Sequence, residues 1–353
     1  MSADHPGRHT KSADPDISLV CPFYNEEILI GAAIERLIPR MAADFAGSDY
    51  EIIFVNDGST DRSQECAEEA LRRHPSAPLR ILGYPFNQGR GRALKTGIDA
   101  ARGRIIVTTE ADLSWGEDIV LRLTTALREN PHAHFVVASV HARGGGLRNV
   151  PILRRVLTTA GNTFIRMMFT GVVTMHTGMT RAYWREVIQP LVTVENGKEF
   201  HLEVILKLLA LGFRPMEIPA TIAWPDAKAA PRRARRKSST NLTRTIGTHL
   251  RFAAIARPVQ YFSWLAVAAL LLGAASIAVA LVSLFLEIPS SNFAIVGLIL
   301  VLFGFALGAF SVVFHQLGEH LSAHWRSSYP PPHPPSATPA RVLYENGRET
   351  VRG

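Results

Sequence analysis

Short apolar runs alternate with longer amphipathic stretches from residue 17 to about residue 222. Apolar runs bounded by turn residues are typical of buried strands, and apolar positions at helical spacing are typical of helices. The pattern predicts strands at residues 17–21, 51–56, 79–83, 105–109, 135–139 and 216–222. It predicts helices near residues 27–45, 61–74, 91–101, 117–130, 153–169 and 200–211. This alternation favours an α/β domain with a mostly parallel sheet, whose ligands lie at the carboxyl ends of the strands.

Two long apolar segments follow. Residues 258–286 and 288–314 contain no charged side chain, and Glu287 alone separates them. A helix needs about 20 predominantly apolar residues to cross a bilayer, so the lengths predict a two-helix transmembrane hairpin, with two buried core helices as the alternative. The short link between the spans carries no Lys or Arg. The positive-inside rule therefore predicts an integral protein of the cell inner membrane, with the α/β domain and both termini in the cytoplasm.

The net charge of +8 is concentrated in one place. Residues 228–257 hold nine basic side chains and no acidic one, so the rest of the chain is close to neutral. A basic run beside a predicted span favours anionic head groups or a phosphorylated ligand over nucleic acid. In the same region Leu242, Ile246 and Leu250 recur every four residues. This spacing predicts an amphipathic helix at the membrane surface, with a packed soluble helix as the alternative.

The chain divides by composition. Residues 1–16 lack the apolar core of a signal peptide and are expected to be disordered, as is the Pro-rich tail at residues 326–353. Residues 17–226 form the α/β domain, and residues 227–257 form the basic linker with its amphipathic helix. The two cysteines, Cys21 and Cys66, have no metal-binding or disulfide pattern, which fits a reducing compartment.

Acidic residues gather where predicted strands end. Glu26 follows the first strand, Asp57 the second, and Glu110 and Asp112 the fourth. An isolated acid there is commonly a helix N-cap, but three acidic strand ends in one domain favour a site. Two nearby carboxylates suit Mg²⁺, which takes its remaining ligands from water and substrate phosphates. P-loop, dinucleotide-binding, metalloprotease and serine-hydrolase motifs are absent from the sequence, which argues against those classes.

The order of these motifs carries a family resemblance. Pro22-x-Tyr24-Asn25-Glu26 is followed by Asn56-Asp57-Gly58-Ser59-Thr60-Asp61, then Asn87-x-Gly89-x5-Lys95-x-Gly97, then Glu110-Ala111-Asp112. This series resembles the family 2 glycosyltransferases, which have the GT-A fold. Residues 177–183, 200–219 and 233–239 extend the resemblance to the dolichol-phosphate mannosyltransferase and polyprenyl-phosphate glycosyltransferase branch. Glu110 stands at the first position of the family's usual DxD motif, and this departure bears on substrate identity more than on reaction class.

The resemblance implies an inverting hexosyltransferase with a nucleotide-diphospho-sugar donor, GDP-mannose or a UDP-hexose, and mannose as the preferred sugar. Mg²⁺ or Mn²⁺ would be held by Glu110, Asp112 and Ser114, with Asp112 and Arg233 as the catalytic residues. The donor would be bound by Pro22, Tyr24, Glu26, Val55, Asp57, Lys95 and Ala111. The acceptor, a polyprenyl or dolichyl phosphate, would be bound through its phosphate by Arg181, Glu203, Arg233, Arg235, Arg236, Lys237 and Ser238.

A lipid phosphate and an alcohol differ, as acceptors, in whether they need a base. A phosphate monoester has a second pKa of about 6 and is already ionised at neutral pH, whereas an alcohol needs a base. The basic run could attract such a phosphate, or it could only fix topology and bind head groups. A family 2 transferase acting on a hydroxyl acceptor and a catalytically silent scaffold remain as alternatives. A homo-oligomer is compatible with the sequence.

Overall fold

The computed structural model describes residues 14–112, 114–148, 173–176, 178–223, 258–287, 291–328, 343–345 and 348–350. These residues fall into two compact units. The first holds the described residues up to 223 together with the last two strands, and the second holds those between 258 and 328. The helices expected at residues 153–169 and 242–250 lie outside the described residues.

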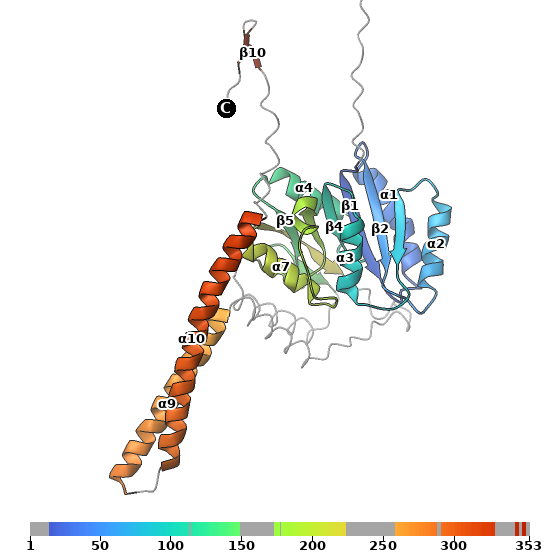
Figure 1. The fold of residues 1–353 in the computed structure, drawn as a ribbon. Coiled ribbons are helices and arrows are strands. Elements are labelled where there is room, and N and C mark those ends of the chain that lie inside the picture. The colour runs from blue at the N-terminus through green and yellow to red at the C-terminus, as the bar shows by residue number, and fades with distance from the viewer. Residues whose placement is uncertain are drawn as a thin grey trace, which may run out of the picture. The chain divides into compact units, whose positions relative to one another are not determined.

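A seven-stranded sheet forms the centre of the first unit, in the order β3-β2-β1-β4-β7-β5-β8 (Figure 1). β7 runs antiparallel to its neighbours β4 and β5, and every other pair is parallel. The mostly parallel sheet is therefore confirmed, whereas β7 is a strand that the apolar pattern does not predict. The strands are β1 (Ile17–Phe23), β2 (Tyr50–Asn56), β3 (Leu79–Gly83), β4 (Ile105–Thr108), β5 (Phe135–Ser139), β7 (Arg181–Trp184) and β8 (Pro215–Pro219).

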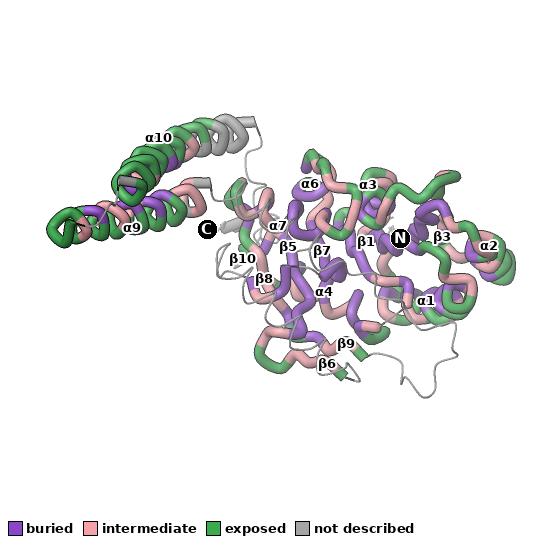
Figure 2. The backbone as a smooth tube through the Cα atoms, turned by 90° about the horizontal axis from the view of Figure 1, so that it is seen from below, coloured by how far each residue is buried: buried purple, intermediate pink, exposed green. Residues whose placement is uncertain are grey.

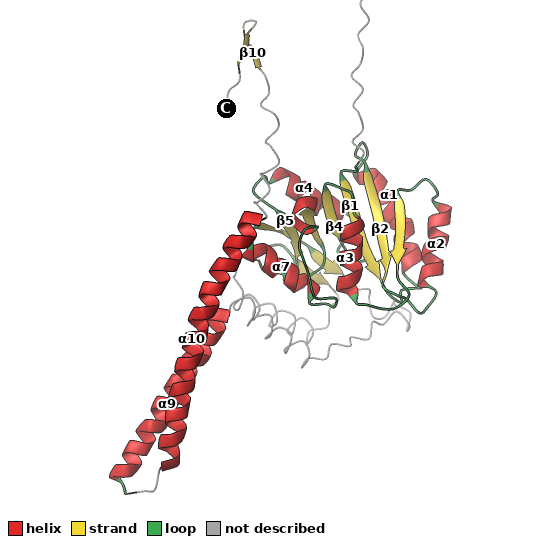
Figure 3. Ribbon diagram, in the orientation of Figure 1, coloured by secondary structure: helices red, strands yellow, loops and turns green. Residues whose placement is uncertain are grey.

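Helices cover both faces of this sheet, which explains why its central strands are almost continuously apolar. Seen along the strands in Figure 2, α3, α6 and α7 lie on one face and α1 and α4 on the other, and Figure 3 shows the same layers from the side. The predicted helices that the structure describes are present within a few residues of their expected ends. The helices are α1 (Ile30–Asp44), α2 (Ser63–Arg73), α3 (Arg90–Ala100), α4 (Ile119–Glu129), α6 (Arg185–Ile188) and α7 (Phe200–Ala210).

The last predicted strand of the domain, at residues 216–222, is divided in two. The chain leaves β8 at Pro219, and after Ala220 it enters β9 (Thr221–Ala223), which pairs with β6 (Gly146–Arg148) in a separate two-stranded sheet. Ala220 marks the change of partner, because its N–H donates to Ser139 O (2.9 Å) while its carbonyl accepts from Gly146 N (3.1 Å). β9 thus lies just beyond the carboxyl end of β8.

Two long apolar helices form the second unit, α9 (Pro258–Phe285) and α10 (Ser291–Ser328). Tyr261–Phe285 and Asn292–Leu317 are each long and apolar enough to cross a membrane. Glycines allow the helices to approach closely: a Cβ on Gly273 would lie 2.9 Å from Gly297 O, and a Cβ on Gly304 would lie 3.1 Å from Ala266 O. Small residues at helix contacts are typical of membrane hairpins. The second helix continues beyond residue 314, where the apolar segment ends.

Part of the C-terminal tail also differs from its expectation. β10 (Leu343–Glu345) and β11 (Arg348–Thr350) pair antiparallel, where the proline content of residues 326–353 predicts disorder. The intervening sequence Asn346-Gly347 is a strong hairpin signal.

Candidate active site

Several loops meet at the carboxyl ends of the parallel strands, on the lower side of the sheet in Figure 1. The loop after β1 is joined to the loop after β2 by several hydrogen bonds, two of them made by Asn25 and its neighbours at short distances. The N–H of Thr60 donates to Asn25 Oδ1 (2.8 Å), and the N–H of Asn25 donates to Ser59 Oγ (3.1 Å). Both loops are therefore ordered by their own short polar side chains.

Five of the predicted nucleotide-binding residues lie at or just after these strand ends. Pro22 is half-buried near the end of β1, and Tyr24 beyond it is 41% exposed. Glu26 is half-buried in the following turn. Val55 and Ala111 are buried, so any contact that they make with a nucleotide would use their main-chain groups. The structure brings these residues to one edge of the sheet, and their nucleotide contacts remain a prediction.

Asp57 organises the loop between β3 and α3. Its Oδ1 accepts hydrogen bonds from Tyr84 Oη (2.7 Å) and from the N–H groups of Gln88 and Gly89 (3.0 Å each). Its Oδ2 accepts from Asn87 Nδ2 (3.0 Å). Burial and the hydrogen bond to the Asp57 carboxylate both raise the pKa of Tyr84. Asp57 is thus already engaged in positioning a loop, a role that its motif alone does not reveal.

Gly58 makes this arrangement sterically possible. It has a φ of +66°, and a Cβ added to it would overlap main-chain atoms of Phe86 and Asn87. A residue with a side chain would meet both a strained backbone conformation and a clash with the next loop. The glycine after Asp57 is therefore required where the loops after β2 and β3 touch.

The predicted metal-binding residues lie together after β4. Ser114 contacts both acids: its Oγ donates to Glu110 Oε2 (3.1 Å), and its N–H donates to Asp112 Oδ1 (3.0 Å). The Glu110 side chain is 21% exposed, and Asp112 is half-buried. Ser114 is therefore hydrogen-bonded to both carboxylates of this turn, to one through its main-chain N–H and to the other through its hydroxyl.

The ligand chemistry of this turn fits a hard divalent cation. Mg²⁺ and Mn²⁺ prefer oxygen ligands, and Mg²⁺ is commonly held by one or two carboxylates plus substrate phosphates. Among the described residues there is no group of three or more His, Cys, Asp or Glu side chains that could hold a metal by themselves. Glu110, Asp112 and Ser114 thus suit a cation that takes its remaining ligands from a diphosphate and water.

Two basic residues on α3 have different surroundings. Arg90 begins the helix, and its Nη1 lies 3.7 Å from Glu110 Oε1, next to the proposed metal site. Lys95 lies further along, where its Nζ donates to Asp99 Oδ1 (2.8 Å) and to Gln189 O (3.4 Å). Its side chain is only 22% exposed. These contacts tie α3 to the segment after α6. Because they already engage the Lys95 ammonium group, its contact with the donor stays a prediction.

The segment after α6 also reaches the N-terminus of α3. The carbonyl of Asn196 accepts hydrogen bonds from the N–H groups of Gly91 (2.7 Å) and Arg92 (3.2 Å). These are among the first N–H groups of the helix, which have no partner within it. Segment 189–196 is therefore attached to α3 at several points along its length.

Arg181, predicted to bind the acceptor phosphate, is completely buried in β7. Its Nη1 donates to His201 O (2.8 Å) and its Nη2 to His176 O (2.7 Å). Burial, followed by the positive charges of Arg181 and Arg90, lowers the pKa of His201 well below its ordinary value. The guanidinium therefore joins α7 to residues 173–176 from inside the domain, and a phosphate could reach it only after rearrangement.

Glu203, the other described residue predicted to bind acceptor phosphate, is 4% exposed on α7. Its carboxylate accepts from the N–H groups of Val194 (2.9 Å) and Glu195 (2.8 Å) and from Lys207 Nζ (2.6 Å). It therefore positions segment 189–196, which makes direct binding of an anionic phosphate less favourable. The remaining predicted acceptor residues, Arg233, Arg235, Arg236, Lys237 and Ser238, lie outside the described residues.

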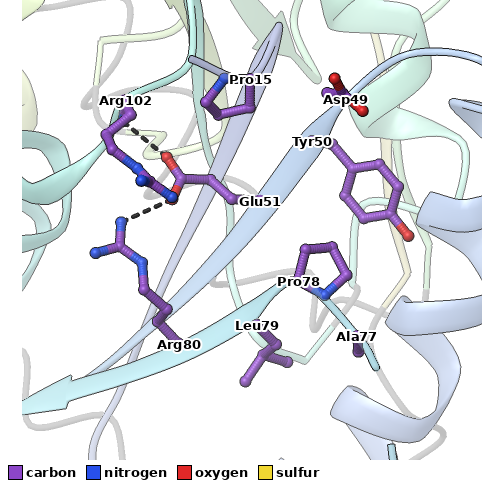
Figure 4. Close-up of a pocket in the computed structure, with 9 residues that line it drawn as sticks. All are labelled: Pro15, Asp49, Tyr50, Glu51, Ala77, Pro78, Leu79, Arg80 and Arg102. Atoms are coloured by element: carbon purple, nitrogen blue, oxygen red, sulfur yellow. Dashed lines mark hydrogen bonds and ion pairs between the residues drawn. The ribbon is translucent and has the colours of Figure 1, made fainter. Parts of the chain in front are cut away.

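A second cluster, absent from the sequence-based predictions, lies at the opposite edge of the sheet. Glu51, at the start of β2, lines a pocket of about 300 Å³ with Arg80 and Arg102 (Figure 4). Its carboxylate accepts from Ser18 Oγ (2.6 Å), Arg80 Nη2 (2.7 Å) and Arg102 N (2.7 Å). Burial raises the pKa of Glu51, but these donors outweigh it and leave the pKa below its ordinary value. The only sequence signal was one acid within an apolar run.

The family comparison concerns the region that contains this geometry. The family model described as Glycosyl transferase family 2 matches residues 18–191, which include β1 to β7 and the Glu110–Ser114 turn. The chain contains a glycosyl transferase family 2 domain. Its mostly parallel sheet, with helices on both faces, is a GT-A-like α/β fold. The family 2 domain thus has its acids at the carboxyl ends of its parallel strands.

Curated relatives of the family 2 domain cover only part of the chain. "Uncharacterized glycosyltransferase YkcC" of Bacillus subtilis is 34% identical over 120 residues, or 34% of this chain and 36% of the relative. "Undecaprenyl-phosphate 4-deoxy-4-formamido-L-arabinose transferase" of Edwardsiella ictaluri is 29% identical over 205 residues, 58% of each chain. The protein of that name from Pseudomonas aeruginosa is 30% identical over 200 residues, 56% of this chain and 54% of the relative. The matched length is thus less than two thirds of each relative.

Solved structures also resemble the family 2 domain, at low identity. Glucosyl-3-phosphoglycerate synthase from Mycobacterium tuberculosis, in complex with Mn²⁺, UDP and glucosyl-3-phosphoglycerate, aligns with a TM-score of 0.47 and 20% identity, over 59% of this chain and 71% of that one. The mannosyltransferase PcManGT from Pyrobaculum calidifontis, in complex with GDP-Man and Mn²⁺, aligns with a TM-score of 0.44 and 21% identity, over 61% of this chain and 59% of that one.

Proposed function

We propose that this chain is a membrane-anchored, inverting glycosyltransferase that transfers a sugar from a nucleotide diphosphate to a polyprenyl phosphate. The observation that carries the proposal is the position of Ser114. It contacts Glu110 and Asp112, and its carbonyl accepts a hydrogen bond from the N–H of Ala223 (2.9 Å). Ala223 is the last described residue before the segment that leads to the apolar hairpin. The proposed catalytic turn is therefore bonded to the end of β9, and the two apolar helices follow later in the sequence.

The donor is proposed to bind across the loops after β1, β2 and β4. Pro22, Tyr24 and Glu26 contribute from the first loop, and Val55 and Asp57 from the end of the second strand. Asp57 has a dual role, because its side chain already holds the loop after β3. The nucleoside therefore meets loops that are ordered before it binds, which lowers the entropic cost of binding.

The diphosphate of the donor is proposed to lie at Glu110, Asp112 and Ser114. Mg²⁺ or Mn²⁺ bound there would neutralise the negative charge that develops on the departing nucleoside diphosphate. The N–H of Ser114 fixes one oxygen of Asp112, and the Ser114 hydroxyl fixes one oxygen of Glu110. Arg90, close to Glu110, supplies a further positive charge on this side of the site.

The reaction is a single displacement. An oxygen of the acceptor phosphate attacks the anomeric carbon, and the bond between that carbon and the donor's diphosphate breaks. The nucleoside diphosphate leaves with the bonding electrons, and the configuration at the anomeric carbon inverts. The attacking oxygen is already ionised at neutral pH, since the second pKa of a phosphate monoester is about 6. No side chain therefore has to remove a proton, and the protein must chiefly orient two anions.

Basic residues of the linker are proposed to hold the acceptor. Arg233, Arg235, Arg236, Lys237 and Ser238 follow the domain in the sequence, and a guanidinium can bind two phosphate oxygens at once. Two relatives are named for undecaprenyl phosphate, which supports this class of acceptor. The proposed location is the cytoplasmic face of the membrane, where the basic linker follows the positive-inside rule.

The proposed sugar is a hexose, and mannose from GDP-mannose is the first choice. The relatives are named for transfer of 4-deoxy-4-formamido-L-arabinose, which makes a nucleotide-linked derivative of that sugar the competing donor. The test reconstitutes the full chain in phosphatidylcholine nanodiscs containing undecaprenyl phosphate. Labelled GDP-mannose, UDP-glucose, UDP-N-acetylglucosamine and UDP-4-deoxy-4-formamido-L-arabinose are supplied separately, with Mg²⁺, Mn²⁺ or EDTA.

The expected result is metal-dependent transfer of label from one donor into the lipid extract, with release of the nucleoside diphosphate. Arg233→Ala and Lys237→Ala should raise the KM for the lipid phosphate and leave the KM for the donor nearly unchanged. No transfer with any donor and metal would contradict the proposed function. Unchanged lipid-linked product in both variants would contradict only the proposed role of the linker.

A further inference from the structure

The exposed apolar side chains of the domain have an uneven distribution. Among the described residues between 14 and 223, the large hydrophobic side chains that are exposed are Tyr24, Ile28, Leu29, Phe86, Val192 and Val194. Phe86 is 77% exposed and Val194 75% exposed. Exposure of single apolar residues is normal, but gathering of such residues at one place marks an interaction surface.

Most of these side chains belong to the carboxyl edge of the sheet. Ile28 and Leu29 lie between β1 and α1, and Phe86 lies between β3 and α3. Segment 189–196 runs beside α3 toward the helix N-terminus, where Asn196 is bound. Val194, two residues earlier, therefore lies near the same edge, and Val192 lies further back. We call Ile28, Leu29, Phe86 and Val194 the apolar rim.

The rim is held in place by polar contacts beneath it. Phe86 lies in the loop that Asp57 binds on both sides, through Tyr84 and Asn87. The N–H of Val194 donates to the buried carboxylate of Glu203 (2.9 Å). Buried carboxylates thus fix two main-chain segments whose apolar side chains face solvent. Exposed apolar area on ordered segments is unfavourable in water, at about 25 cal/mol per Å², and becomes favourable when an apolar partner covers it.

The chain itself indicates what that partner is. β9 follows the carboxyl end of β8, and β8 is parallel to β5 and hence to β4, β1, β2 and β3. Ala223, at the end of β9, therefore lies at the same edge as the rim, where its N–H donates to Ser114 O (2.9 Å). Residues 228–257, which come next, hold nine basic side chains and no acid, and two helices long enough to cross a membrane follow. Exposed apolar side chains, in a chain that also carries a basic segment and apolar spans, are typical of proteins that bind anionic bilayers.

We propose that the apolar rim inserts into the interface of an anionic lipid bilayer, so that the carboxyl edge of the sheet faces the membrane. The inference deepens the proposed function and depends on it for membrane anchorage. Apolar side chains at such an interface enter about 5–10 Å into the boundary between head groups and acyl chains. The rim thereby sets the height of the Glu110–Ser114 turn above the lipid phosphates, where a polyprenyl phosphate presents its own phosphate.

The test uses an environment-sensitive fluorophore on single cysteines of the full chain, reconstituted in nanodiscs of phosphatidylcholine and phosphatidylglycerol. Cys66→Ser removes the partly exposed native thiol, and burial of Cys21 raises its pKa and keeps it unreactive. Phe86→Cys and Val194→Cys place the probe on the rim. Ser76→Cys places it at an exposed position just before β3, on the opposite edge.

Spin-labelled lipids should cause loss of fluorescence at positions 86 and 194 and none at position 76. Trp264→Cys, on an exposed position of α9, reports insertion of the hairpin separately. Quenching at 264 with none at 86 and 194 overturns the proposal and leaves membrane anchorage intact. Equal quenching at 76 and 86 also overturns it. Self-quenching between labelled copies, without quenching by spin-labelled lipid, would assign the rim to a second copy of the chain instead. The assay needs neither donor nor acceptor, so it is independent of transfer activity.

Discussion

The two ends of strand β2 carry acids with contrasting surroundings. At the amino end, Glu51 is bound by two arginines, Arg80 and Arg102, together with a serine hydroxyl. Past the carboxyl end, Asp57 accepts hydrogen bonds from a tyrosine, an asparagine and main-chain N–H groups. No cationic side chain of the described residues forms an ion pair with Asp57. The amino-end acid is therefore paired with cations, whereas the carboxyl-end acid is held in position by neutral donors.

The same contrast extends to the proposed metal site. Glu110 and Asp112 are oriented by the hydroxyl and N–H of Ser114, both of them neutral donors. Arg90 Nη1 lies 3.7 Å from Glu110 Oε1, the same separation as between Arg102 Nη2 and Glu51 Oε2. Among the described residues, however, no cationic side chain donates to Glu110 at the 2.7 Å at which Arg80 Nη2 donates to Glu51. Neutral groups of Ser114 thus hold both carboxylates in position, and carboxylates held in this way suit the binding of a divalent cation. The comparison predicts that mutations at the two edges will separate activity from stability.

The largest effect is expected for Asp112→Asn. Loss of a proposed metal-binding carboxylate should lower transfer activity by more than the ~10–100-fold that removal of an outer-shell group costs. The thermal unfolding midpoint should change little, because Asp112 is only half-buried. Lipid-linked product is measured in nanodiscs at saturating Mn²⁺. Glu117→Gln, which removes an exposed acid paired with Arg36, is the control. Equal activity in the two variants would show that Asp112 is not part of the metal site.

Gly58→Ala should give the next largest effect, a loss of free energy of unfolding. Strain at positive φ costs about 1–2 kcal/mol, and overlap with the loop at Phe86 adds about 1–3 kcal/mol. The control is Gly47→Ala, at the amino end of the same strand, where φ is +94° but no atom lies within 4 Å of the new Cβ. Guanidinium unfolding followed by tryptophan fluorescence compares the free energies of unfolding. Equal losses in the two variants would show that the contact between the loops is unimportant.

Glu51→Gln should lower the free energy of unfolding by about 2–3 kcal/mol, because it replaces a buried, charge-paired carboxylate. The loss is below that of a fully buried pair, since Arg80 and Arg102 are 39% and 59% exposed. Transfer activity per folded molecule should be unchanged, in contrast to Asp112→Asn. Arg72→Gln, an exposed change on α2, is the control for general effects of charge. A large loss of activity with unaltered stability would reverse the roles assigned to the two edges.

The Glu51 network also predicts a pH dependence. Because folding lowers the pKa of Glu51 from its ordinary value of 4.5, its contribution to stability is complete above that value. The contribution declines as the pH falls through the lowered pKa of the folded state. The difference in unfolding free energy between the natural chain and Glu51→Gln should therefore shrink on acidification below about pH 4.5. A difference that stays constant to strongly acidic pH would contradict an ionised, paired Glu51.

Tyr84→Phe should have the smallest effect. It removes one hydrogen bond to Asp57, worth about 1 kcal/mol, and leaves the other donors in place. The KM for the donor should rise modestly with little change in kcat, because the loop loses order but no proposed catalytic group is removed. Tyr50→Phe, on the amino end of β2, is the matched control. A larger fall in kcat than in donor affinity would give Tyr84 a direct role in the reaction.

Periodicity in the sequence predicted most of the first unit's helices and strands, because each is apolar over a length that suits one type of element. It missed β7, where Arg181 interrupts the apolar pattern and is accommodated by the carbonyls of His176 and His201 and by the Tyr183 hydroxyl. It also merged β8 with β9, since the change of partner at Ala220 is a tertiary event. Long-range pairing, rather than local propensity, decides both cases.

Prediction of the site was uneven for a related reason. The pairing of Glu110 and Asp112 followed from their spacing within one turn, and Ser114 was added from the family resemblance. The surroundings of Arg181, Glu203 and Lys95 did not, because they depend on segments distant in sequence, such as residues 189–196. The motif around Asp57 was found, but its bond to Tyr84 was not, because nothing local links residues 27 positions apart.

Strand β7 has a consequence for how the domain is made. β4 and β5 do not pair with each other, and each pairs with β7, which is complete only at residue 184. While the ribosome is still producing residues before 181, the partly formed sheet has an open edge at β4, and such edges pair readily with other chains. Nascent chains that stall in this interval are therefore the forms most exposed to aggregation, and the last strand to arrive at the centre of the sheet ends that exposure.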